Sequence, residues 1–157
     1  MIGRTVLGHT LIMTTLLLAG CGQQQAPPAI PFELATDMHH TMELILDPAA
    51  DKIWDSAGFI ITEAGEQDLS PTTDEGWHEV ESAAAVLAET GNLLLLPGRS
   101  EGADWDAYAV GLREAGKLAM QAALDQDAEA LFAAGGNIYQ VCKACHSQYL
   151  IEEEAAP

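Results

Sequence analysis

Three residues near the C-terminal end have the types and spacing for cofactor chemistry, in the run Cys142-Lys143-Ala144-Cys145-His146. Two thiols three positions apart, followed at once by an imidazole, form the spacing at which haem is attached through two thioethers, with the histidine binding iron. On a helix, positions 142, 145 and 146 share one face, so all three side chains can meet one flat ring. The run therefore predicts one covalently bound haem c.

The same two thiols have other uses, namely a disulfide, a redox pair or half a zinc site. A structural zinc site needs four ligands, and the sequence has no second cysteine pair and no histidine pair with finger spacing. A thioredoxin-like redox pair belongs near a strand-to-helix junction, whereas this pair lies near the end of a strongly helical segment. These points favour haem attachment.

The N-terminal residues have the pattern of an export signal, which we assign to residues 1–20 and exclude from the fold. Arg4 supplies the positive start, and residues 6–18 form an apolar core too short to span a bilayer. Leu18-Ala19-Gly20-Cys21 resembles the bacterial lipoprotein box, which implies cleavage before Cys21 and lipidation of its thiol. An ordinary secretory signal with a chance cysteine is the alternative.

Lipidation would leave a water-soluble domain tethered to the membrane by its lipid alone. Residues 21–31 are polar and proline-rich and are predicted to be a flexible tether. Gly22 stands where an aspartate would resemble an inner-membrane retention signal, which favours the outer membrane. We therefore expect residues 32–157 to be one cytochrome domain on the periplasmic side of that membrane.

The charge of the chain is strongly acidic, with 24 Asp and Glu, six Lys and Arg, and a formal net charge of −18. This balance excludes nucleic acid as an expected partner, because phosphate binding needs clustered cations. The acidic surface is either a docking surface for a basic redox partner or a solvated surface suited to high salt.

Apolar residues recur at intervals of three and four over four segments bounded by turn residues, and the expected inward faces include Leu34, Met38, Met42 and Ile45 in the first segment and Leu131, Gly135 and Ile138 in the last. Thr72 with Glu75 and Asp104 are the expected N-terminal caps of the second and third segments. Four amphipathic helices with almost no strand pattern predict an all-α antiparallel four-helix bundle around the haem. The predicted helices are residues 32–47 with a kink or restart at Pro48 and a continuation to 54, residues 72–96, residues 104–124 and residues 128–152.

Three glycines within these helices have two readings each. Gly91 is either an interior position of close packing or the end of the second helix. Gly135 and Gly136 either make room beside the haem or mark a local bend.

A haem-attachment run near the end of a fourth helix and a methionine on the first helix resemble the class II c-type cytochromes, that is, the cytochrome c prime family and its methionine-ligated relatives. The resemblance spans residues 32–150, and its specific part is 141–149. It implies a four-helix bundle, and paired subunits are common in that family, although no residue here selects a homodimer interface. The family often has a basic residue where this chain has Leu150, so Lys52, Arg99 and Arg113 are the remaining candidates for contacting the haem propionates.

The ligand opposite His146 decides the function. A thioether there gives Met/His ligation, which raises the reduction potential and suits electron transfer. Met42 is the first candidate, because its place before Pro48 resembles the helix-one methionine of the family, and Met38 is the second. An open position with apolar walls would instead bind nitric oxide or carbon monoxide.

Residues beside these methionines offer a further possibility. His39 and His40 lie off the apolar stripe and are expected to be solvated, yet the run Met38-His39-His40-Thr41-Met42 could also hold copper. The sequence contains no nucleophile with a paired base, no catalytic pair of carboxylates and no phosphate loop, so we do not expect an enzyme.

Overall fold

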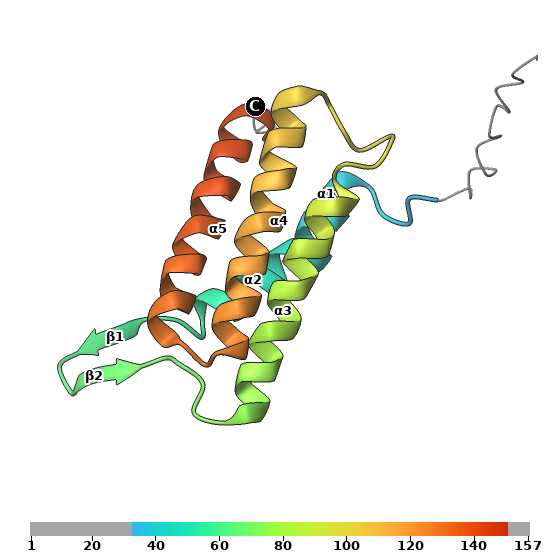
Figure 1. Ribbon diagram of the computed structural model, residues 1–157. Helices are drawn as coiled ribbons and strands as arrows, with labels where there is room; N and C mark the ends of the chain where they lie inside the picture. Colours follow the sequence, from blue (N-terminus) through green and yellow to red (C-terminus); the bar gives the residue numbers. More distant parts are fainter. Residues whose placement is uncertain (1–32, 151–157) are drawn as a thin grey trace, which may run out of the picture. The chain divides into compact units, whose positions relative to one another are not determined.

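The computed structural model describes residues 33–150, which Figure 1 shows in colour. These residues are mostly helical, which confirms the all-α prediction, and they include one short antiparallel hairpin. The predicted signal (1–20), the tether (21–31) and Cys21 lie outside the described residues. The elements are α1 (Met38–Thr41), a π-helical segment (Met42–Leu46), α2 (Asp47–Trp54), β1 (Phe59–Thr62), β2 (Gly65–Asp68), α3 (Asp74–Leu93), α4 (Ala103–Leu124) and α5 (Ala128–Tyr149).

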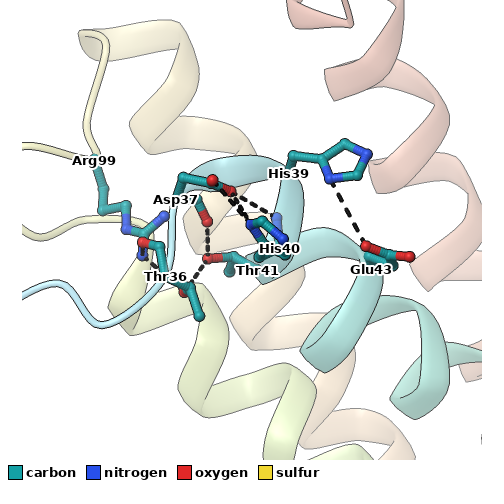
Figure 2. Close-up of polar contacts among 7 residues, drawn as sticks. All are labelled: Thr36, Asp37, His39, His40, Thr41, Glu43 and Arg99. Carbon is teal, nitrogen blue, oxygen red and sulfur yellow. Dashed lines mark hydrogen bonds and ion pairs between the residues drawn. The ribbon is translucent and has the colours of Figure 1, made fainter.

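The first helix begins at Met38, so the predicted start at Phe32 was wrong. Asp37 is extended and caps the helix, because its carboxylate accepts a hydrogen bond at 2.8 Å from the backbone N–H of His40 (Figure 2). Aspartate is a preferred N-cap since it satisfies an N–H that has no partner inside the helix. The apolar spacing that extends back to Leu34 therefore does not mark the helix start.

Pro48 restarts the helix rather than kinking it. It lies at the first turn of α2, directly after the π-helical segment. Proline has no N–H and its ring clashes with the carbonyl four residues earlier, and a π-turn removes that clash by widening the helix. The wider turn changes which residues face inward: Thr41 and Leu46 are buried. The predicted inward stripe of Leu34, Met38, Met42 and Ile45 is only half-buried.

A hairpin occupies the connection that was expected to be a loop. Strand β1 pairs with β2, with Phe59 opposite Asp68 and Thr62 opposite Gly65. Every residue of both strands is exposed. The expectation of a loop over residues 59–68 was therefore wrong, because an apolar run paired with a polar one shows no alternation of buried and exposed residues.

Helix α3 differs from its prediction at both ends. Thr73, not Thr72, is the N-cap, and its hydroxyl accepts from the N–H of Gly76 at 3.1 Å. The helix ends at Leu93, before the predicted end at Leu96. Gly91 is inside the helix, where a Cβ would meet the carbonyl oxygen of Ala109 at 2.8 Å. The structure therefore supports close packing rather than a helix stop at Gly91.

Helices α4 and α5 follow the predicted ranges closely. The N-cap of α4 is Gly102 with φ +117°, so the assignment of Asp104 as the N-cap was wrong. Asp104 lies in the first turn, where its negative charge interacts favourably with the helix dipole and stabilises the helix. The predicted break between α4 and α5 is confirmed, with Gln126 at φ +52° and Asp127 capping α5.

The buried core is shared by all the long helices. Helix α4 packs against both α3 and α5, and α2 packs against the same two helices (Figure 1). The most deeply buried large side chains are Ile53, Val80, Leu87, Leu131 and Ile138. Within residues 33–150, no helix combines the length and the apolar character needed to cross a bilayer.

Candidate functional site

The cysteine–histidine run lies on the last two turns of α5. Cys142, Cys145 and His146 are all half-buried, and both cysteines are free thiols without a disulfide. They continue the inward face that begins with the fully buried Leu131 and Ile138. The helical period places the two thiols and the imidazole on one face.

Three pockets adjoin this run, with volumes of about 40, 340 and 650 Å³. His146 lines all three, and so does Met42 from the π-helical segment of the first helix. Met38 lines the largest pocket only. Met42 and His146 therefore line the same three pockets, although they are far apart in the sequence.

The walls between these two residues are mainly apolar and aromatic. The buried indole of Trp105 is held by a hydrogen bond of 2.9 Å from its Nε1 to the carbonyl of Leu94. Tyr149 packs edge-on against Trp105, with ring centroids 5.0 Å apart. The smallest pocket is completed by apolar residues of four segments, which are Leu46, Leu94, Ala109, Leu112 and Val141.

Burial raises the pKa of both thiols above the ordinary value. For Cys142 the loss of hydration is the largest cause, followed by the nearby Cys145 and Asp47, and for Cys145 it is followed by the charge of Glu101. A thiol whose pKa is raised is neutral at pH 7 and is a poor nucleophile. The environment is therefore unlike that of a reactive cysteine.

The donor set and the lining fit a haem attached through two thioethers. Two free thiols and an imidazole lie on one helix, a thioether lines the same pockets from another helix, and the remaining residues that line the smallest pocket are apolar or aromatic. Gly135 itself lines none of these three pockets. It faces Trp54, whose indole N–H donates to the Gly135 carbonyl at 3.0 Å.

None of the three cations proposed for the propionates lines these pockets. Lys52 is paired with Glu79 at 2.6 Å, and Arg113 contacts Glu114 at 3.0 Å. Arg99 is 5% exposed and donates to the carbonyl of Thr36 at 2.6 Å, while its Nε has no partner among the described residues. All three are engaged in structural contacts.

Sequence reasoning missed the acidic rim of the largest pocket. Glu43, Asp47 and Glu101 line it together with His39 and the proposed haem ligands. Glu43 could have been found, because it lies one helical turn after His39. Glu101 could not, since it comes from the connection between α3 and α4 and only the tertiary fold brings it here.

Comparison of the chain with protein-family models, with curated proteins and with solved structures finds no match.

Proposed function

We propose that this protein is an electron carrier that holds one haem c through Cys142 and Cys145, with His146 and Met42 as the axial ligands of its iron. The observation that carries the proposal is that Met42 and His146 line the same three pockets around the cysteine pair. On this proposal the chain resembles the methionine-ligated class II c-type cytochromes, and its helices form an antiparallel four-helix bundle.

The haem would supply one-electron exchange between ferric and ferrous iron. Cys142 and Cys145 would hold the group through two thioethers, and the His146 imidazole and the Met42 thioether would bind its iron. Trp105 and Tyr149 supply aromatic walls to the pocket shared by Met42 and His146. Met/His ligation would favour the reduced iron and a high reduction potential.

The setting follows from the same residues. Lipidation of Cys21 would tether the domain to the outer membrane on its periplasmic side, with residues 21–31 as the tether. The acidic rim of Glu43, Asp47 and Glu101 would favour a redox partner with a basic surface. Acid side chains at the rim steer such a partner to the edge of the pocket that leads to His146.

The test is the absorption spectrum of the purified haem protein in both oxidation states, with and without carbon monoxide. The parent protein should be low-spin and unchanged by the gas. Met42→Leu should turn the spectrum high-spin and sensitive to carbon monoxide, because the volume is kept but the sulfur is lost. Met38→Leu is the matched control and should keep the parent spectrum.

A high-spin parent spectrum that shifts with carbon monoxide would overturn methionine ligation. It would favour the alternative function, a five-coordinate haem protein that binds nitric oxide or carbon monoxide for scavenging or sensing.

A further inference from the structure

A second cluster of metal-binding side chains lies on the first helix, outside the cysteine run. One donor atom from each of His39, His40 and Glu43 falls within 4.8 Å of the other two. All three residues, which Figure 2 labels, are exposed. We propose that these three residues form a surface site for a divalent transition-metal ion, with Cu²⁺ held more tightly than Zn²⁺.

The spacing between His39 and Glu43 suits a bridging ion better than a direct contact. The Nδ1 atom of His39 is 3.8 Å from the Oε2 atom of Glu43. That distance is too long for a hydrogen bond. Two ligands of a tetrahedral zinc ion, each about 2.0–2.1 Å from the metal, lie about 3.4 Å apart. A small rotamer change on two exposed side chains brings the pair to that separation.

Asp37 prepares His40 as a ligand. The Nδ1 atom of His40 lies 2.9 Å from both carboxylate oxygens of Asp37 (Figure 2). A carboxylate can only accept, so in the neutral imidazole Nδ1 carries the proton and Nε2 keeps its free lone pair. A carboxylate behind an imidazole is the arrangement that fixes the tautomer and raises the basicity of metal-binding histidines.

The structure changes the ligand set that the sequence indicated for copper. Met38 and Met42 are half-buried and pack on the core, whereas Glu43 joins the two histidines at the surface. Two imidazoles and a carboxylate prefer a divalent ion over Cu(I), and the order of affinities for such a site places Cu²⁺ above Zn²⁺. Water can complete the coordination, as it does at zinc sites with three protein ligands.

The chain contains a matched control for an ordinary histidine–carboxylate contact. His78 lies 3.2 Å from Glu81 on α3 and is 76% exposed. It is not part of a cluster of three or more such groups among the described residues. Substituting His78 therefore removes one exposed imidazole beside a carboxylate without touching the proposed site.

The first experiment is titration calorimetry of the full chain and its variants with Zn²⁺. The second is electron paramagnetic resonance of the same proteins after Cu²⁺ has been added. The parent should bind one ion more than the double variant His39→Ala/His40→Ala, and His78→Ala should match the parent. The parent and all variants contain the same Cys142–His146 run, so metal bound to that run contributes equally to every measurement. The difference between parent and variant is therefore independent of haem. Circular dichroism checks that each variant is folded.

Two further variants test the roles of the carboxylates. Glu43→Gln should weaken binding while keeping the size of the side chain. Asp37→Asn should weaken it about 10–100-fold, because asparagine still caps the helix but no longer raises the basicity of His40. Equal Zn²⁺ binding by the parent and the double histidine variant would overturn the site, and so would an equal loss in His78→Ala.

Discussion

The backbone N–H of Asp47 donates to the carbonyl oxygen of Met42, five residues earlier, and the next residue is Pro48. An α-helix would use a spacing of four. Because this turn contains one extra residue, the side chain of Met42 points in a different direction, relative to the buried face of α2, than it would in a continuous α-helix. We therefore infer that Pro48, by imposing the π-turn, sets the direction of the Met42 side chain.

Pro48→Ala should let the α-helical ladder continue through residues 44–48 and rotate Met42 away from His146. The haem protein should then become partly high-spin while the helix content stays constant, because alanine restores a donor and removes the clash. Absorption spectra and circular dichroism measure the two effects. Pro97→Ala, at an exposed proline between α3 and α4, is the control and should leave the spectrum unchanged. An unchanged spectrum in Pro48→Ala would show that Pro48 does not set the direction of Met42.

The contact between α3 and α4 depends on the absence of a side chain at Gly91. An alanine Cβ there would lie 2.8 Å from the Ala109 carbonyl oxygen and from the backbone nitrogen of Arg113. Backbone atoms in two packed helices cannot move aside cheaply. Gly91→Ala should therefore lower the free energy of unfolding by about 1–3 kcal/mol, measured by urea denaturation.

Gly136 supplies the matched substitution. It also lies inside a helix, but a Cβ there meets nothing within 4 Å. Gly136→Ala should raise the free energy of unfolding by about 0.5–1 kcal/mol, because alanine loses less conformational freedom on folding. If both variants changed stability in the same direction, the close approach of the helices at Gly91 would be wrong.

The ion pair between α2 and α3 predicts a pH effect. The hydrogen bond from Lys52, at 2.6 Å, holds the pKa of Glu79 below its ordinary value of 4.5. A carboxyl whose pKa is lowered in the folded state contributes stability above its ordinary pKa, and that contribution is lost as the pH falls through the lowered value. A titration of the Glu79 carboxyl followed by nuclear magnetic resonance should give a pKa below 4.5.

Lys52→Met should return the pKa of Glu79 to its ordinary value. Lys117→Met removes the same charge from a pair with Glu114 at 2.9 Å and should leave Glu79 unchanged. An equal rise of the Glu79 pKa in both variants would indicate a general charge effect rather than the Lys52 contact.

The long helices could be predicted from the sequence because each has a sustained apolar stripe. Leu131 and Ile138 are fully buried on α5, as their spacing indicated. The N-caps were harder to predict, since Thr72 and Thr73 are adjacent in the sequence and threonine is a good N-cap at either position. Gly102 was missed because its left-handed backbone, rather than a side chain, marks the start of α4.

The site was predictable where its residues are close in sequence and unpredictable where the fold assembles it. The thiols and the imidazole come from one run, so helical spacing alone places them together. Met42 reaches the pockets that it shares with His146 from a π-helical turn. The sequence predicts only a kink or restart of the helix at Pro48, not this turn. The hairpin carried no signal, because both of its strands are exposed and no alternation marks them.

The most direct test of the account is the intact mass of the mature protein from a host that can attach haem to cytochromes, followed by mass analysis of the peptide that contains Cys142 and Cys145. The account predicts a coloured protein whose mass is increased by one haem, carried by that peptide. A colourless protein with two free, alkylatable thiols on that peptide would contradict it.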